Sequence, residues 1–144
     1  MNLTEIQEEI IAEFEQYNDW MDKYNYLIEI SKDLNPLDAK YKTTDNLIHG
    51  CQSRVWLVAE MNNGHLVFDA DSDAIITRGI IALLIKVLSD RTPEEIMNAD
   101  LFFIDRIGLR QNLSPTRSNG LLAMVKQMKL YALAYHTKQL KINN

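Results

Sequence analysis

Hydrophobic residues in the first part of the chain recur at the spacing of an α-helix. The stripe consists of Ile6, Ile10, Phe14 and Tyr17, and the glutamates of this segment lie largely outside it. Residues 4–7 have the pattern of a capping box, which predicts the start of this helix. A second helix is predicted from Asn18 or Asp19, and the Asn35-Pro36 pair stops it.

The middle of the chain has the pattern of a β-hairpin. Residues 55–61 and 66–70 are short apolar runs, and Asn63-Gly64 between them favours the positive φ angles of a type I′ turn. Residues 37–50 show no clear period and are predicted to form an extended connection. An isolated hairpin is only marginally stable, so it needs a third strand or a cover of helices.

The second half of the chain is predicted to be helical. Residues 74–88 are apolar almost all round, and their length favours a buried helix over a strand. Residues 92–95 begin another helix, and Ser114-Pro115 precedes a last one that runs towards Lys138. The pattern of residues 101–113 is ambiguous and does not predict a particular element.

These elements predict an α+β fold with a single domain over residues 1–144. A small antiparallel sheet, the hairpin plus a third strand, is covered by two helices before it and three after it. The chain shows no internal repeat and no linker between domains.

Charge is spread unevenly along the chain. The net charge of −5 argues against nonspecific binding of nucleic acid. Residues 106–144, however, hold seven Lys and Arg residues and no Asp or Glu. This basic segment either packs near the acidic first helix or forms a positive face for an acidic partner or a small anion.

The sequence predicts a cytoplasmic protein. The N-terminus is acidic and no apolar signal region follows it, which argues against secretion. Residues 74–88 are about a turn too short to span a bilayer and contain Arg78 and Lys86, so no membrane association is expected. The single cysteine excludes an intrachain disulfide and suits a reducing compartment.

The residues for a metal or cofactor site are scarce. The three histidines, His49, His65 and His136, are far apart in sequence, whereas a structural zinc site usually needs four Cys or His ligands. An iron–sulfur cluster usually needs four thiolates, and the chain has one. No resident cofactor or metal is therefore predicted.

Cys51 remains as the candidate for chemistry. It follows Gly50 at the junction between an irregular loop and a strand, where reactive groups are often placed. The cations Arg54 and His49 lie nearby in sequence and would favour the reactive thiolate. The alternative is that Cys51 is a small buried hydrophobic residue, which is the usual role of a free cysteine.

The sequence around Cys51 resembles the signature of the SufE family. The shared positions are Asn46, Ile48, Gly50, Cys51, Gln52, Ser53, Val55 and Trp56. The resemblance continues at residues 71–74, 78–79, 92–96 and 113–121, in the family's order and spacing, and extends from Trp20 to about Ala134. It implies a fold shared with the NifU-like scaffold proteins.

The resemblance also implies a function. A SufE protein accepts persulfide sulfur on its cysteine from a pyridoxal-phosphate-dependent cysteine desulfurase, of the SufS or CsdA type, and stimulates that enzyme. The sulfur then passes to an iron–sulfur scaffold complex. On this basis Cys51 is the expected acceptor, and the chain is a sulfur carrier rather than an enzyme. The pyridoxal phosphate belongs to the partner.

Supporting roles are expected for the residues around the acceptor. The candidates are His49, Gly50, Gln52, Ser53, Arg54, Asp71, Asp73 and Arg117. Asp71 and Asp73 would position the Cys51 loop, although a simpler interpretation makes them helix caps. Arg117 would face the partner or the loop, or else lie on the surface at the start of a helix.

Two other functions are compatible with a single cysteine at this position. A cysteine hydrolase or transferase would need a histidine base beside Cys51. His49 is two residues away, and its side chain is expected to point away from the thiol. The other alternative is an interaction module with a structural thiol. Only a carrier would gain about 32 Da per sulfur from cysteine and a desulfurase.

Overall fold

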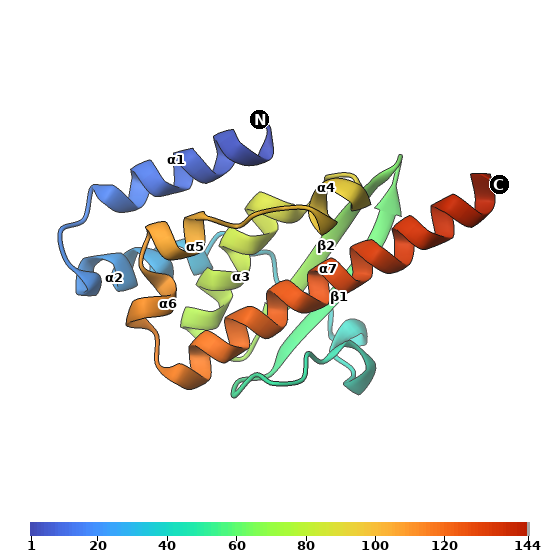
Figure 1. Ribbon diagram of the computed structural model, residues 1–144. Helices are drawn as coiled ribbons and strands as arrows, with labels where there is room; N and C mark the ends of the chain where they lie inside the picture. Colours follow the sequence, from blue (N-terminus) through green and yellow to red (C-terminus); the bar gives the residue numbers. More distant parts are fainter. Residues whose placement is uncertain (144) are drawn as a thin grey trace.

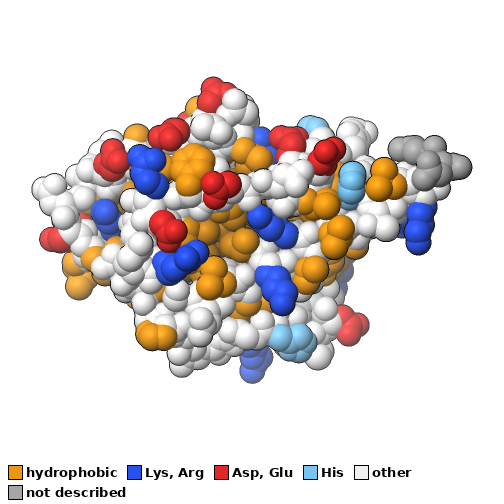
Figure 2. All heavy atoms as spheres, viewed as in Figure 1, with side chains coloured by type: hydrophobic (Ala, Val, Ile, Leu, Met, Phe, Trp, Pro, Cys, Tyr) orange, Lys and Arg blue, Asp and Glu red, His pale blue; other side chains and the backbone are white. Residues whose placement is uncertain are grey.

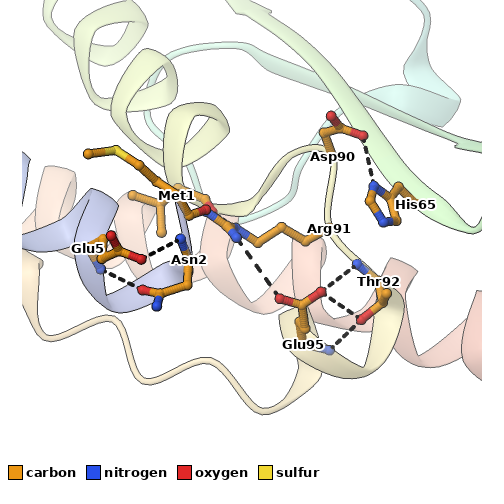
Figure 3. Close-up of polar contacts among 9 residues, drawn as sticks. Met1, Asn2, Glu5, His65, Asp90, Arg91, Thr92 and Glu95 are labelled. Atoms are coloured by element: carbon orange, nitrogen blue, oxygen red, sulfur yellow. Dashed lines mark hydrogen bonds and ion pairs between the residues drawn. The ribbon is translucent and has the colours of Figure 1, made fainter.

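The N-terminal half begins with the two predicted helices. The computed structural model describes residues 1–143, and in it α1 spans Leu3–Glu15 and α2 spans Trp20–Ser31 (Figure 1). Asp19 caps α2, as predicted. The capping box predicted at residues 4–7 is wrong, because Asn2 is the N-cap of α1. Its side chain accepts a hydrogen bond from the Glu5 N–H, and the Glu5 carboxylate reaches back to the Asn2 N–H (Figure 3).

The predicted hairpin is confirmed. Strands β1, Val55–Asn62, and β2, His65–Ser72, pair antiparallel with Val55 opposite Ser72 and Asn62 opposite His65. Asn63 and Gly64 have φ angles of 53° and 83°. The backbone at the turn therefore has the left-handed conformation that the Asn-Gly pair predicts.

The third strand does not form within residues 1–143. The sheet has two strands, and each outer edge carries only an isolated bridge, Leu47 to Trp56 and Leu66 to Arg91. The segment before β1 instead coils into two 3₁₀ turns, Ala39–Tyr41 and Thr44–Asn46, so it is too curved to pair along the strand. The hairpin is stabilised by its helical cover.

The C-terminal half contains more helices than predicted. Helix α3 spans Ile75–Leu88, α4 spans Pro93–Met97, and α7 spans Pro115–Asn143. The ambiguous segment between α4 and α7 forms two short helices, α5 at Phe103–Arg106 and α6 at Leu109–Asn112. The capping box predicted at residues 92–95 is confirmed (Figure 3). The Glu95 N–H donates a hydrogen bond to the Thr92 hydroxyl oxygen, and the Thr92 N–H donates one to the Glu95 carboxylate.

Helices α3 and α7 lie over one face of the hairpin and enclose the core there (Figure 1). The residues that meet between them are Val55, Leu57 and Ala70 of the sheet, Ile81 and Leu84 of α3, and Met124 and Met128 of α7. Helix α2 packs closely on α3, because Gly79 has no side chain to collide with the Leu27 carbonyl oxygen. The apolar all-round pattern of residues 74–88 is thus explained by contacts on several sides of α3.

Among the described residues, Arg106 makes the ion pairs between the basic C-terminal segment and the acidic first helix. Its guanidinium lies 4.0 Å from carboxylate oxygens of Glu8 and Glu15, and Lys86 of α3 lies 3.5 Å from Glu9. Figure 2 shows Lys and Arg side chains interspersed with hydrophobic ones over the face that α7 crosses. Within residues 1–143, no helix is both long and apolar enough to cross a bilayer.

Candidate functional site

Cys51 lies in a short loop whose two ends are joined. We call residues 49–54 the Cys51 loop. The Ile48 N–H donates a hydrogen bond of 2.9 Å to the Val55 carbonyl oxygen, and Leu47 bridges Trp56. Ile48 and Val55 are both buried, so the ends of the loop are fixed in the core while its residues project beyond β1.

The connection between β2 and α3 holds one end of the loop through the backbone of Arg54. The Arg54 N–H donates to Asp73 Oδ1 at 3.1 Å, and the Arg54 carbonyl oxygen accepts from the Ser72 hydroxyl at 2.7 Å. Asp73 thus positions the Cys51 loop. The interpretation of Asp71 and Asp73 as helix caps is wrong, because the N-cap of α3 is Ala74, which has no side-chain hydrogen bond.

Asp71 holds a different segment. It is buried, and Oδ2 accepts from the Leu37 N–H at 3.1 Å and lies 3.3 Å from Lys42 Nζ. Burial opposes ionisation of this carboxyl group. The hydrogen bonds from Leu37, Ser72 and Lys42 and the charge of Arg78 outweigh that cost and lower the pKa of Asp71. Asp71 therefore anchors the connection before the loop, and its hydrogen bonds and ion pairs within residues 1–143 are with residues outside the loop.

Helix α7 forms the other wall of the site. The Cys51 Sγ lies 3.7 Å from the Gly120 carbonyl oxygen, and a Cβ placed on Gly50 would lie 3.5 Å from Cβ of Ala123. Gly50 has a φ angle of +93°, which a residue with a side chain rarely adopts. The loop thus turns at Gly50 and places the thiol against the first turns of α7.

A small cavity adjoins the thiol between α3 and α7. Its volume is about 20 Å³, and it is lined by Cys51, Gln52, Ser53, Thr77, Ile80, Thr116, Arg117, Gly120 and Met124. Arg117 therefore faces the Cys51 loop, and its guanidinium lies 3.5 Å from the Tyr24 hydroxyl. The lining brings together residues from the loop, α3 and α7.

Burial raises the pKa of the Cys51 thiol. The activation expected from Arg54 and His49 is therefore not what the isolated chain provides. Both of these side chains are exposed, and the contact recorded for Sγ is the Gly120 carbonyl rather than a histidine. Burial thus favours the protonated thiol, and among residues 1–143 no hydrogen bond joins a histidine to Sγ.

The predicted site residues divide into three groups. Gln52, Ser53 and Arg117 line the cavity beside Cys51, and Gly50 forms the turn before it. Asp73 and the Arg54 backbone fix the loop. His49 and Asp71 do not line the cavity. Sequence reasoning did not assign a role to Thr77 or Gly120, and it interpreted Met124 as part of the core. The signal for Gly120 was available, because a lone glycine inside a helical pattern often marks close packing. No cluster of three metal-ligating side chains occurs within residues 1–143.

Comparison with known proteins identifies the family. Residues 8–132 match the sequence model described as "SufE: Fe-S metabolism associated domain". The chain belongs to the SufE family. The match covers the Cys51 loop, both strands and most of α7, so the SufE assignment and its association with iron–sulfur metabolism apply to the whole site described above.

Two individual proteins resemble this SufE chain. "SufE-like protein 1, chloroplastic/mitochondrial" from Arabidopsis thaliana is 41% identical over 132 residues, which are 91% of this chain and 36% of the relative. The chain thus spans about a third of the length of that relative. A hypothetical protein from Thermus thermophilus, solved in solution, superimposes with a TM-score of 0.75 over 92% of this chain and 96% of its own. At 18% identity it shows the same fold.

Proposed function

We infer that the protein is a sulfur carrier that accepts persulfide sulfur on Cys51 from a cysteine desulfurase. The observation that supports this most directly is the placement of the chain's only thiol at the wall of a small cavity, in a loop fixed at both ends. Membership of a family associated with iron–sulfur metabolism supports sulfur as the cargo.

The transfer is a thiol exchange. The Cys51 thiolate attacks the outer sulfur of the donor persulfide, a new S–S bond forms at Cys51, and the bond between the two donor sulfurs breaks. The donor cysteine leaves as a thiolate, so one sulfur atom moves and nothing is oxidised or reduced overall. The absence of a second cysteine from the chain suits this chemistry, because a neighbouring thiol would collapse the persulfide into a disulfide.

The raised pKa of Cys51 has a consequence for the carrier. In the isolated chain the thiol is mostly protonated and half-buried, so it reacts slowly with the wrong partners. The desulfurase, on docking, draws the Cys51 loop outward and presents the thiol to its own persulfide. The loaded carrier then delivers sulfur to an iron–sulfur scaffold complex and stimulates the desulfurase by removing its product.

The compartment follows from the chemistry. A single free thiol needs surroundings that keep it reduced, as the cytoplasm does. The name of the Arabidopsis relative assigns that protein to chloroplasts and mitochondria. Carrier chemistry at Cys51 requires only a compartment that keeps the thiol reduced.

The test uses the Cys51→Ser variant beside the parent protein. Each is incubated with free cysteine and a desulfurase, and the intact mass and the rate of sulfide release are measured. The parent is expected to gain about 32 Da per sulfur and to stimulate release. The variant, whose hydroxyl nearly matches the thiol in size, keeps the fold and does neither. Full stimulation by Cys51→Ser would show that the carrier mechanism is wrong.

A further inference from the structure

Gly120 is placed where a glycine is costly. It lies inside α7, a helix of 29 residues, and glycine destabilises a helix interior relative to alanine. It is also buried. A glycine at such a position needs a reason in the packing around it.

The thiol form of Cys51 does not supply that reason. A Cβ added to Gly120 would lie 3.6 Å from Sγ, 3.7 Å from Cα and 3.9 Å from Cβ of Cys51. These are ordinary van der Waals contacts, so alanine would fit against the thiol. Gly79 differs, since a Cβ there would collide with the Leu27 backbone.

The space beside Gly120 matches a larger form of Cys51. The cavity of about 20 Å³ that Gly120, Thr77 and Met124 help to line adjoins Sγ. That volume holds about one atom of the size of a water molecule. In a persulfide the outer sulfur would lie about 2.05 Å from Sγ, so it would enter this space if the loop keeps its position.

We propose that Gly120 is a positioning residue that reserves room for the outer sulfur of the Cys51 persulfide, so that the loaded carrier closes over its cargo. The inference rests on the proposed carrier function and adds a residue to it. An alanine at position 120 would occupy the room that the second sulfur needs, while leaving the room for the thiol. The loaded loop would then be held away from α7, and the sulfur would face solvent.

The experiment compares Gly120→Ala with the parent and with Asn119→Ala. Asn119 is the exposed neighbour on α7, so its substitution controls for a gain in helix propensity. Each protein is loaded by a small-molecule persulfide, which makes loading independent of the desulfurase, and is then exposed to cyanide. Cyanide bonds to the outer sulfur, the S–S bond breaks, Cys51 leaves as a thiolate, and thiocyanate forms. Intact mass follows the loss of sulfur.

The expected result is a persulfide half-life about tenfold shorter in Gly120→Ala than in the parent and in Asn119→Ala. The alkylation rate of the unloaded thiol should differ by less than about twofold among the three proteins, because the thiol fits beside alanine. Equal half-lives in Gly120→Ala and the parent would overturn the proposal. So would equal acceleration of alkylation and cyanolysis, because Gly120 would then seat the loop in both forms. A carrier that fails to take sulfur from a desulfurase, yet shows these half-lives, would contradict the proposed function and not this inference.

Discussion

At the scale of single residues, Cys51 is controlled by desolvation. Its pKa is raised by burial, so the thiolate forms at a higher pH than in an unfolded chain, where the value is about 8.5. The pH profile of alkylation by iodoacetamide should therefore have its midpoint above that of the same protein in denaturant. An equal or lower midpoint in the folded protein would mean that cations, and not burial, dominate at the thiol.

The same shift has a defined sign for stability. A group whose pKa is raised in the folded state stabilises the fold fully below the unfolded value, and that contribution is lost as the pH rises through the folded value. The melting temperature should fall above about pH 8.5 by more in the parent than in Cys51→Ser, which has no group that ionises there.

Arg117 is the residue that best separates partner binding from stability. Its side chain is partly exposed, lines the cavity and makes a long hydrogen bond of 3.5 Å to the Tyr24 hydroxyl, so its loss should lower the melting temperature by less than about 3 °C. We expect Arg117→Ala to reduce stimulation of a desulfurase about tenfold, because hydrogen bonds from a charged group to a partner are strong. The melting temperature and the stimulation of the desulfurase are measured for Arg117→Ala and for a control, Arg110→Ala. The control removes an arginine that is paired with Asp105 on α5. A large loss of melting temperature with unchanged stimulation would assign Arg117 to the structure instead.

At the scale of elements, the contact between α2 and α3 depends on Gly79. The Leu27 carbonyl oxygen lies where a side chain at position 79 would begin, and backbone atoms of a packed helix cannot move aside cheaply. Gly79→Ala should cost about 1–3 kcal/mol of unfolding free energy, despite the better helix propensity of alanine. Gly120→Ala is the matched control, because the same change in α7 meets only ordinary contacts and should be neutral or stabilising in the unloaded protein. Unfolding in denaturant measures the change in unfolding free energy for both variants. Equal changes in Gly79→Ala and Gly120→Ala would contradict the close approach of α2 to α3 at Gly79.

Elements were predictable from sequence where the signal is local. The helical stripe of α1, the Asn63-Gly64 turn and the Thr92 capping box depend on residues within a few positions of one another, and all are present. The prediction of a third strand was wrong, because its place was not given by any local pattern. The segment before β1, which has no period, coils into 3₁₀ turns instead of pairing.

The site residues likewise divide into those that are close in sequence, which were predictable, and those that packing brings together, which were not. Cys51, Gly50 and Ser53 are adjacent in sequence and could be found from their pattern. Thr77 and Gly120 reach the cavity from two different helices. The lone glycine in a helical pattern indicates close packing at position 120, but the pattern does not show that the packing partner is Cys51. The sequence left Asp73 with two roles, and the structure decides for positioning of the loop because its partner is the Arg54 backbone 19 positions away.

At the scale of the whole molecule, α7 connects the site to the sheet. Its first turns form the wall against Cys51, and further along Tyr135 donates a hydrogen bond of 3.3 Å to the Ala59 carbonyl oxygen of β1. The ends of the Cys51 loop are likewise tied to the sheet, through Ile48 and the β2–α3 connection. The elements around the loop are thus joined to one another, and on the proposed carrier mechanism the segment that moves on docking is the part of the Cys51 loop before Arg54.

A fixed scaffold with a short loop predicts how access to Cys51 changes when a partner docks. In the isolated protein the thiol is half-buried with a raised pKa, so its alkylation should be about tenfold slower than that of a small-molecule thiol at neutral pH. A desulfurase whose own nucleophilic cysteine has been removed should accelerate this alkylation, because docking draws the loop outward before any chemistry occurs. The measurement is the rate of mass gain from iodoacetamide with and without that partner. Arg117→Ala should lose the acceleration while keeping the slow basal rate, since the weakened partner no longer opens the loop. Alkylation of the free protein at the rate of a small-molecule thiol, with the partner only protecting Cys51, would show that the loop is open throughout.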